Sequence, residues 1–501
     1  MMCKSPFGAF SSKMACAFIG LMAPAVSAGA AEGKYLGPLD VVASSDGKTL
    51  FVVEADAGRI DVVDVAAEKV VRSIACPAEP TGLAVNSDSS RLYITCSGPK
   101  GVVCVADPAS GQIAATIPVG HTACGPSLAS DGKRLYVCNR FDNDVSVIDL
   151  EAKKEIERVK ALREPSASAI TPDGGFVFVS NLLPVDPASS YHVAAEITVI
   201  NTSTLKTSNI RLHNGSSSVH GICFSPDGKY AYVVHVVSRF QIPTTQLELG
   251  WMNTNAMSII DVASIELINT VLLDDVESGA ANPWGVAATA DGKQIAVTHA
   301  GTHEVSVIDA DALHDKLAGI PKTMAEAKAA GLDIYSATTA SDVPNDLEFL
   351  ARMRRRIKLR PNDGSETATD VGLLVSGPRG LAVIGSKIYV AVYFCDLLAI
   401  VDLEDKSDYP VRLMRLGPEP ELTPERRGEL CFHDAHFCFQ QWQSCASCHP
   451  DARVDALNWD LLNDGIGNAK NVKSMLLAHQ TPPSMFGGIR ENAEAAVRSG
   501  I

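Results

Sequence analysis

Short runs of alternating apolar and polar residues, separated by polar turns, extend from residue 36 to about residue 417. A typical run is Arg134-Leu135-Tyr136-Val137, and alternation of this kind predicts a β-strand with one buried face. A short apolar run such as Gly82-Leu83-Ala84-Val85 precedes each Asp-Gly turn, and an alternating run follows it. Glycine suits these turns because it takes positive φ at little steric cost. Two further short runs follow before the order repeats, which predicts four antiparallel strands in succession.

This unit of four strands recurs along the chain. The aspartates that mark its turns are Asp46, Asp88, Asp131, Asp173, Asp227 and Asp291. The first four lie 42, 43 and 42 residues apart, and a degenerate seventh unit begins near residue 385. Four antiparallel strands at this spacing are typical of a propeller blade, which must stack on other blades to bury both of its faces. We therefore expect a mainly β protein with a seven-bladed β-propeller over residues 36–417.

The units resemble the YVTN-type β-propeller repeat of surface-layer and lactonase-like proteins. The resemblance implies the fold rather than an activity, because propellers carry many unrelated functions.

The N-terminus is similar to a secretory signal peptide. Lys4 and Lys13 precede an apolar run over residues 14–26, and small residues around 26–30 offer cleavage sites. A run of 13 residues interrupted by Pro24 is too short to span a bilayer. We expect residues 1–30 to be a signal peptide, the protein to be periplasmic or secreted, and the chain to have no transmembrane anchor.

Composition excludes some partners. The chain has 501 residues, 46% of them hydrophobic, and a formal net charge of −15. An acidic surface disfavours nucleic acid, whose binding requires a basic footprint, and it suits basic protein partners.

Residues 445–449, Cys-Ala-Ser-Cys-His, form a CxxCH motif. Thiols at this spacing add to the two vinyl groups of haem, and the histidine that follows binds the iron from the proximal side. We therefore predict one covalent haem c on Cys445 and Cys448, with His449 as the proximal ligand. A zinc site is the alternative, and it would need a second pair of ligands. The neighbouring residues that offer such a pair are Cys431, His433, His436 and Cys438.

The flanks of this motif resemble the first haem half of the di-haem cytochrome c peroxidase family, which includes the methylamine-utilisation maturase. The matching segments are residues 426–434, 450–453, 458–460, 463–465, 473–474 and 481–488. The resemblance implies a small all-α cytochrome c domain over residues 418–501. The family uses two haems, whereas this chain has one CxxCH motif, so we expect the domain to be truncated.

The distal iron ligand has three candidates. Met485 lies in a proline-rich loop that we expect to fold over the haem, and Met475 and His479 are its rivals. Met475 has a second interpretation as a core residue, because Met475-Leu476-Leu477 has the composition of an apolar helix stripe. A methionine ligand favours electron transfer, whereas an open iron favours peroxide chemistry.

Polar residues gather where the first strand of each blade begins and the second ends. We call this end of the propeller the mouth. The residues placed there are Glu54, Cys96, His121, Cys124, Cys138, Asn139, Arg140, Asn181, His220, His235, Arg239, Trp284, His299, Arg379 and Tyr393. They form either a funnel that binds a ligand or a water-filled channel lined by mutually bonded side chains. A metal site on His220, His235 and His299 is the less favoured alternative, and disulfides among Cys96, Cys124 and Cys138, or between Cys431 and Cys438, remain open.

An insertion follows the sixth unit, at about residues 313–373. We expect it to be helical, because residues 323–330 are alanine-rich and residues 347–359 place apolar residues at helical spacing. Its basic residues are Arg352, Arg354, Arg355, Arg356, Lys358 and Arg360. They form either a solvated helix face or a docking patch for an acidic partner or for haem propionates.

Together these features predict a periplasmic haem c redox protein. The propeller would serve as a platform for a redox partner protein or a small-molecule substrate. The alternatives are a peroxidase-like oxidoreductase without its second haem, and a binding scaffold built on the propeller.

Overall fold

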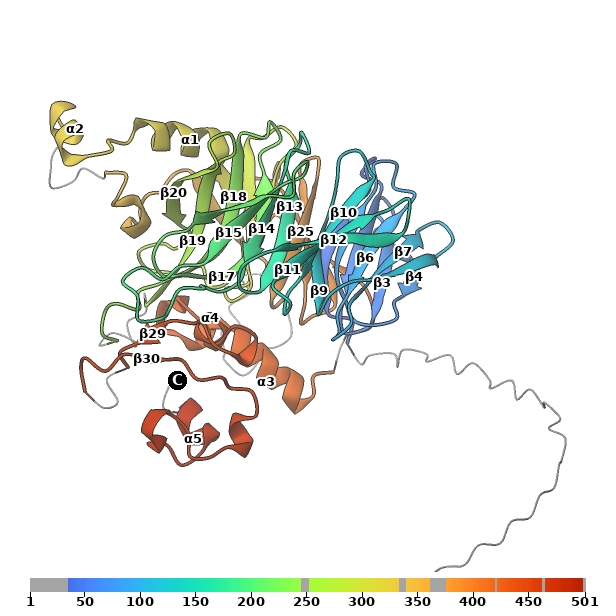
Figure 1. Ribbon diagram of the computed structural model, residues 1–501. Coiled ribbons are helices and arrows are strands. Elements are labelled where there is room, and N and C mark those ends of the chain that lie inside the picture. Colours follow the sequence, from blue (N-terminus) through green and yellow to red (C-terminus); the bar gives the residue numbers. More distant parts are fainter. Residues whose placement is uncertain are drawn as a thin grey trace, which may run out of the picture.

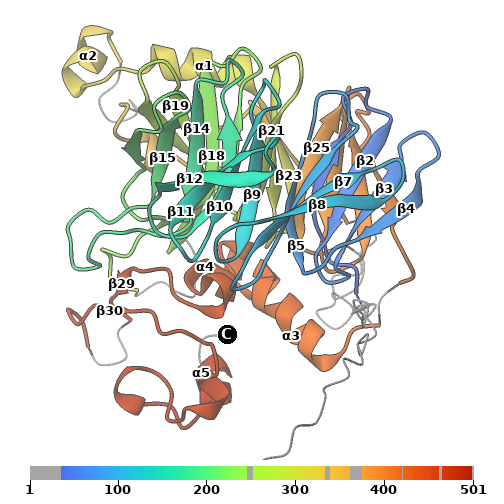
Figure 2. The same cartoon turned by 45° about the vertical axis from the view of Figure 1, so that its right-hand side comes forward.

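The computed structural model describes residues 35–244, 252–332, 339–360, 375–419, 421–461 and 465–498. Seven four-stranded antiparallel sheets stand around a common axis (Figures 1 and 2). The first four blades consist of β1 (Pro38–Ala43), β2 (Thr49–Glu54), β3 (Arg59–Asp64), β4 (Lys69–Ala75); β5 (Pro80–Val85), β6 (Leu92–Cys96), β7 (Val102–Asp107), β8 (Gln112–Pro118); β9 (Ala123–Leu128), β10 (Arg134–Asn139), β11 (Asp144–Asp149), β12 (Lys154–Lys160); β13 (Pro165–Ile170), β14 (Phe176–Asn181), β15 (Glu196–Asn201) and β16 (Thr207–Arg211). The last three consist of β17 (Ser216–Phe224), β18 (Tyr230–Ser238), β19 (Asn253–Asp261), β20 (Glu266–Leu272); β21 (Pro283–Ala288), β22 (Gln294–His299), β23 (Glu304–Asp309), β24 (Arg354–Lys358); β25 (Pro378–Ile384), β26 (Lys387–Val392), β27 (Leu397–Asp402) and β28 (Val411–Arg415). The predicted seven-bladed propeller is confirmed, whereas the predicted signal peptide lies outside the described residues.

The turns between first and second strands form as the sequence predicts. Gly132 and Gly292 take φ of 67° and 74°, in the region that glycine occupies without strain. The aspartate before each glycine accepts a hydrogen bond from the backbone amide of the residue that follows the glycine. The amide of Lys133 donates to Asp131 at 2.9 Å, and the amide of Lys293 donates to Asp291 at 3.1 Å. These contacts fix the hairpin and therefore the register of the first two strands.

The ring is narrow at its centre. Each first strand contacts the first strand of the next blade, and β25 contacts β1. A Cβ atom at Gly125 would lie 2.7 Å from Cα of Ala167, and one at Gly380 would lie 2.7 Å from Cα of Asp40. Glycine at these positions lets neighbouring blades approach this closely.

No strand is shared between the last and first blades, because every sheet is built from consecutive strands, so their joint depends largely on side chains. Leu50 and Val52 of blade one pack there against Tyr389 and Leu398 of blade seven. Each fully buried aliphatic side chain of this kind contributes about 1.5–3 kcal/mol to folding.

The insertion of blade six differs from the prediction in its second half. Its first half contains α1 (Ala310–Gly319) and α2 (Met324–Ala329), and α2 includes the alanine-rich stretch. Residues 354–358, which we expected to be helical, instead form β24, paired with β23 as the fourth strand of blade six. Pairing with an existing strand outweighs the local helical spacing, because it completes the sheet. Residues 333–338 and 361–374 of the insertion lie outside the described residues.

Two basic side chains of this strand are not part of a free surface. Arg354 contacts Asp275, and Arg356 lies 2.9 Å from Asp275 and 2.7 Å from Glu304. The two arginine side chains are only 4% and 12% exposed. The interpretations as a solvated helix face or a docking patch are therefore wrong for these two arginines, which form internal ion pairs.

The C-terminal segment, residues 418–498, is less regular than the all-α domain that we expected. It contains α3 (Pro424–His433), α4 (Cys445–Cys448), α5 (Ala493–Arg498) and a small ladder of β29 (Asn458–Trp459) with β30 (Lys470–Asn471). The apolar helix stripe proposed for residues 475–477 does not form. Leu476 and Leu477 are 57% and 61% exposed, and Leu477 has φ of 56°. None of the helices in the described part of the chain has the length and hydropathy of a membrane span.

Candidate functional site

Helix α4 places the two thiols of the CxxCH motif one helical turn apart. Its backbone amide at Ser444 donates to the Ser447 hydroxyl at 3.1 Å, and the amide of His449 donates to the carbonyl of Cys445 at 2.9 Å. Cys445 is exposed and Cys448 is half-buried, and both thiols are unpaired. Both sulfur atoms are therefore free to form thioether bonds.

His449 has one ring nitrogen engaged and suits metal ligation. Its Nδ1 lies 3.2 Å from the carbonyl oxygen of Arg453. A carbonyl can only accept a hydrogen bond, so Nδ1 carries the proton and the lone pair of the neutral ring lies on Nε2. Burial is the largest influence and lowers the pKa of His449, although the carbonyls of Arg453 and Lys473 raise it. The neutral imidazole is the form that binds iron.

The surroundings of the motif also suit an apolar macrocycle. Cys448 packs against an apolar cluster of Val193, Phe240, Met252, Leu457 and Trp459. The C-terminal segment also exposes large apolar side chains, namely Phe437, Phe439, Ile466, Leu476, Leu477 and Ile489. Two free thiols, a neutral histidine and uncovered apolar side chains fit a covalent haem.

The three candidates for the distal ligand lie in the loop that follows β30. The amide of Met475 donates to the carbonyl of Ala452 at 2.8 Å, which ties it to the end of the motif. Met485 is half-buried, and its carbonyl lies 3.4 Å from Nζ of Lys473. His479 is exposed, with Nε2 3.1 Å from Gln480 Nε2. All three remain predictions.

The C-terminal segment covers the mouth of the propeller, with α3 and α4 directly against it (Figures 1 and 2). Asn282 holds α4 at both of its ends, donating to the Ser444 hydroxyl and accepting from the Ser447 hydroxyl, each at 2.6 Å. Nδ2 of Asn253 lies 3.2 Å from the sulfur of Cys448. The motif is thus fixed on blades five and six.

Ion pairs add a second attachment, to blades three and four. Arg140 lies 3.1 Å from Glu164 and also contacts Asp451, and Arg453 contacts Glu164. Burial alone would raise the pKa of Asp451, but Arg140, together with His220 and Arg453, outweighs it and lowers that pKa to about 2. Asp451 is therefore a carboxylate at neutral pH, and this attachment persists there.

A third attachment crosses the joint between blades one and seven. Arg426 of α3 lies 2.8 Å from Asp56 after β2, and it donates to the carbonyl of Tyr393 after β26 at 3.2 Å. Its guanidinium also lies 4.5 Å from the ring centroid of Tyr393 and 4.8 Å from that of Phe394. One buried side chain therefore bonds the first and last blades together.

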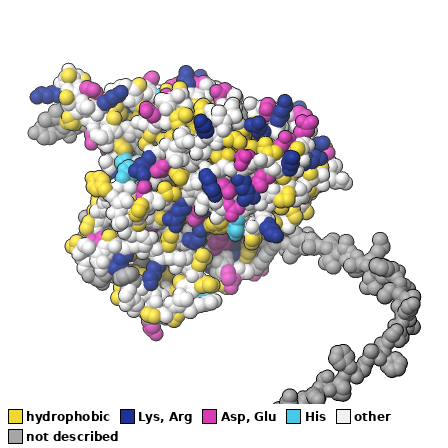
Figure 3. All heavy atoms as spheres, in the orientation of Figure 1, with side chains coloured by type: hydrophobic (Ala, Val, Ile, Leu, Met, Phe, Trp, Pro, Cys, Tyr) yellow, Lys and Arg dark blue, Asp and Glu magenta, His cyan; other side chains and the backbone are white. Residues whose placement is uncertain are grey.

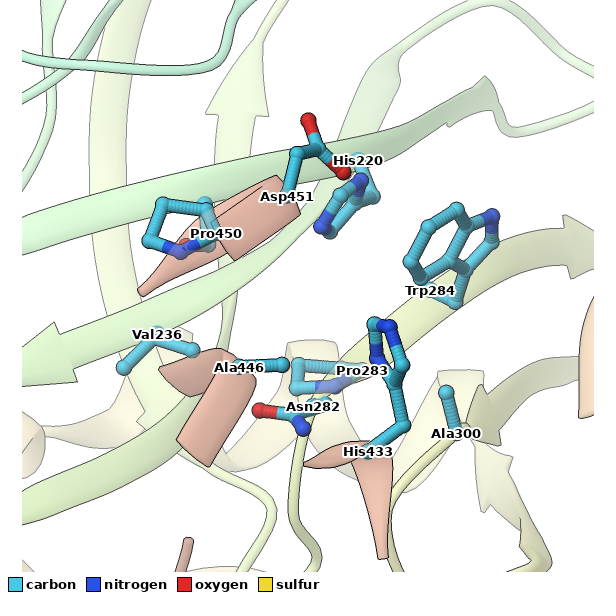
Figure 4. A pocket seen from close by; sticks show the side chains of 11 residues that line it. His220, Val236, Asn282, Pro283, Trp284, Ala300, His433, Ala446, Pro450 and Asp451 are labelled. Carbon is cyan, nitrogen blue, oxygen red and sulfur yellow. The ribbon is translucent and has the colours of Figure 1, made fainter. Parts of the chain in front are cut away.

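Between α4 and the propeller lies a small cavity, shown in Figure 4. His220 stacks on Trp284 at 3.9 Å, and His433, Ala446 and Asp451 approach from the C-terminal segment. The cavity holds about 20 Å³, room for about one water molecule and far less than a usual substrate pocket. The interpretation of the mouth as an open funnel is therefore not supported.

The polar residues at the ends of the second strands bond within their own blades. Asn139, Asn181, His235 and His299 each contact a hydroxyl on the adjacent third strand at 2.8, 3.0, 2.8 and 2.8 Å. The hydroxyls belong to Ser146, Thr198, Ser258 and Ser306. This pattern supports the interpretation of mutually bonded side chains over a metal site on His220, His235 and His299.

Two of the arginines predicted at the mouth also have structural partners. Arg239 donates to Pro344 and Asn345 of the insertion at 2.8 and 2.7 Å, and the guanidinium of Arg379 lies 3.6 Å from the ring centroid of Tyr393. The cysteines in the described ranges, which include Cys96, Cys124, Cys138, Cys431 and Cys438, are all unpaired.

One group of metal-ligand types was not foreseen, because its members come from distant segments. His303, Asp434 and His436 offer ligand atoms that all lie within 4.8 Å of one another, and no other group in the described residues does so. However, the amide of Gly377 donates to Nδ1 of His303 at 3.1 Å, so the ring proton lies on Nε2, which faces Asp434 Oδ1 at 3.3 Å. A metal ion on Nε2 would have to displace this proton. The arrangement is better explained as a buried carboxylate between two histidines: His436 Nδ1 is hydrogen-bonded to Asp434 Oδ1 at 2.7 Å, and His303 Nε2 faces the same oxygen without a hydrogen bond.

Comparison with known proteins agrees with the fold. Hydrazine synthase subunit beta of Kuenenia stuttgartiensis is 27% identical over 301 residues, which cover 58% of this chain and 76% of that protein. A seven-bladed beta-propeller protein of Mycobacterium tuberculosis is 28% identical over 159 residues, 31% of this chain and 36% of that protein.

A solved structure of Kuenenia stuttgartiensis hydrazine synthase superposes with a TM-score of 0.61 and 23% identity, covering 75% of this chain and 98% of that chain. No family model matches the chain. The chain is a seven-bladed β-propeller protein that is similar to the β subunit of hydrazine synthase. In this chain a C-terminal segment covers the mouth of the propeller.

Proposed function

We propose that this chain is an exported, periplasmic redox protein that binds one haem c on Cys445 and Cys448. His449 would be the proximal ligand. The observation that carries the proposal is the site on α4, where two unpaired thiols one turn apart precede a neutral histidine with its Nε2 lone pair available. When bound, the haem would supply one-electron redox chemistry, and the chain would hold and shield it.

The propeller in this proposal is a rigid support rather than a substrate pocket. The cavity at its mouth has room for about one water molecule, so a larger substrate cannot enter between the blades and α4. Electrons would therefore pass to or from a partner protein, or a small molecule, that reaches the exposed side of the motif at Cys445. On the face in Figure 3, acidic and basic side chains are interspersed, so the net negative charge is not gathered there.

The test is covalent haem attachment. The full chain would be produced in a bacterium that matures c-type cytochromes, and the haem would be followed on denaturing gels and by its pyridine haemochrome spectrum. We expect the wild-type chain to retain haem after denaturation and the double variant Cys445→Ala, Cys448→Ala to lose it. Cys431→Ala, a half-buried thiol outside the motif, is the matched control and should retain haem. A wild-type chain without covalent haem would refute the proposal.

The ligand set then separates electron transfer from peroxidase-like chemistry. A far-red charge-transfer band in the ferric spectrum, lost in either Met475→Ala or Met485→Ala, would identify a methionine ligand and favour an electron carrier. A high-spin ferric spectrum that changes with peroxide would instead favour the peroxidase-like alternative.

A second candidate function is that of a subunit in a multi-protein complex. The observation that favours it is the similarity to a protein named as the β subunit of hydrazine synthase. Crosslinking in cells that express the chain, followed by mass spectrometry, tests it. Recurrent crosslinks from the outer propeller strands to one partner would support this role, whereas an isolated monomer would contradict it.

A further inference from the structure

Asp455 is a buried carboxyl group with neutral partners. It is 0% exposed, and it accepts hydrogen bonds from the backbone amide of Leu457 at 3.0 Å and from the indole nitrogen of Trp459 at 2.7 Å. No described lysine, arginine or histidine lies within ion-pair distance of it. A buried carboxylate without a counter-charge is disfavoured, so its neutral acid form gains in stability.

The charged residues on either side of it in the chain are engaged elsewhere. Arg453 contacts Glu164, and Asp460 accepts a hydrogen bond from the amide of Gly467 at 2.7 Å. Burial is the largest influence on Asp455 and raises its pKa to about 7, although the two hydrogen bonds lower it. Asp455 therefore changes its charge near neutral pH.

Asp455 is also close to the attachment site. Its hydrogen-bond partner Trp459 belongs to the apolar cluster against which Cys448 packs. Burial and then the negative charge of Asp455 raise the pKa of the Cys448 thiol to about 12. The polar side chain that reaches Cys448 from the propeller, Asn253, is uncharged. In this low-dielectric region a charge on Asp455 acts on whatever is bound to Cys448.

We propose that Asp455 is a proton site coupled to the haem, which takes up a proton when the iron is reduced and releases it when the iron is oxidised. This inference rests on the proposed function. The oxidised state would be ferric haem with Asp455 ionised. One electron from a one-electron donor and one proton from solvent would convert it to ferrous haem with Asp455 protonated. The added electron disfavours a nearby carboxylate, and the bound proton in turn favours the reduced state.

The measurable consequence is a midpoint potential that falls as pH rises. The fall occurs between the pKa of Asp455 in the oxidised protein and its higher pKa in the reduced protein. If one proton accompanies each electron, the limiting slope is about 59 mV for each tenfold change in proton concentration.

The experiment is a spectroelectrochemical titration of the full haem-loaded chain at several pH values around neutrality. We expect a pH-dependent potential in the wild type and a much flatter one in Asp455→Asn. Asp460→Asn, a buried aspartate in the same segment, is the matched control and should keep the wild-type slope. An Asp455→Asn variant with the wild-type slope would assign the proton to another group, such as a propionate, and would overturn the inference.

A second variant keeps the test valid if Asp455→Asn does not fold. The hydrogen bond from the Trp459 indole holds the pKa of Asp455 down. Trp459→Phe removes this donor, so the pKa of Asp455 should rise and the pH-dependent interval should move to higher pH while the slope remains. An unchanged interval in this variant would also count against Asp455. A wild-type chain that carries no haem refutes the proposed function, whereas a haem-loaded wild type with a pH-independent potential refutes only this inference.

Discussion

At the scale of single residues, the polar side chains at the mouth serve mainly to complete their own blades. Asn139 and His299 each bond a third-strand hydroxyl, at 2.8 Å in both cases. The order of strands in the sequence is sufficient to predict that such residues gather at one end of the ring. Their partners are harder to predict, because pairing between strands decides which hydroxyl each side chain faces.

Glu54 differs from these residues in that it has no partner. It is 0% exposed, and neither carboxylate oxygen makes a hydrogen bond in the described structure. Burial, followed by the charges of Asp61 and Asp396, raises the pKa of Glu54 well above its ordinary value. In the folded protein the side chain therefore stays protonated at pH values where the unfolded chain ionises.

This difference predicts that Glu54→Gln changes the pH dependence of stability. The pKa of Glu54 is higher in the folded protein than in the unfolded chain. The free energy of unfolding of the wild type therefore falls by up to about 1.4 kcal/mol for each pH unit between these two pKa values. Glutamine cannot ionise, so the variant should gain stability over the wild type as the pH rises above the ordinary pKa of a glutamate, as measured by chemical unfolding at several pH values. Parallel pH curves for the two proteins would show that Glu54 is already ionised in the folded state.

At the scale of elements, β24 shows why the insertion was only partly predictable. Its local sequence has helical spacing of apolar residues, but the vacant edge of β23 and the acidic groups at Asp275 and Glu304 select a strand. The fold brings both features to β24, and neither can be read from the local sequence around residues 354–358. By contrast, the strands of the other blades are joined by much shorter connections, so their pattern alone is sufficient.

The arginines of β24 should therefore matter for stability. Arg356→Met removes the cation from Glu304, which is only 5% exposed, and should destabilise the protein by about 3–5 kcal/mol. Lys358→Met, an exposed position on the same strand, is the control and should change stability by less than about 0.5 kcal/mol. Denaturant unfolding measures both, and equal effects of the two substitutions would show that Arg356 contributes no more than a surface charge.

At the scale of the whole molecule, the C-terminal segment completes a ring that no shared strand closes. The CxxCH motif and its flanks were recognisable in the sequence, but their position over the mouth was not, because the contacts join residues hundreds of positions apart. Arg426 and Asp56 are an example, at 2.8 Å. The expected all-α domain was also too regular, since the segment is fixed largely by contacts with the propeller.

Loss of Arg426 should therefore weaken the ring at one place. Arg426→Gln should destabilise the protein by an amount on the order of 3 kcal/mol and speed hydrogen exchange in β1 and β28 more than in other blades. Arg427→Gln, its exposed neighbour on α3, is the matched control and should leave exchange unchanged. Exchange that accelerates evenly around the ring would argue against a local role for Arg426.

The double attachment of Arg426 has a consequence for how a redox group on this chain would operate. One of the side chains that hold the C-terminal segment also joins the first and last blades, so a movement of the segment away from the mouth would remove a bond between these two blades as well. A group bound to α4 would act as a stationary relay. Its partners would have to come within tunnelling distance of it, and the rate of exchange would depend on their docking rather than on the motion of a tethered arm.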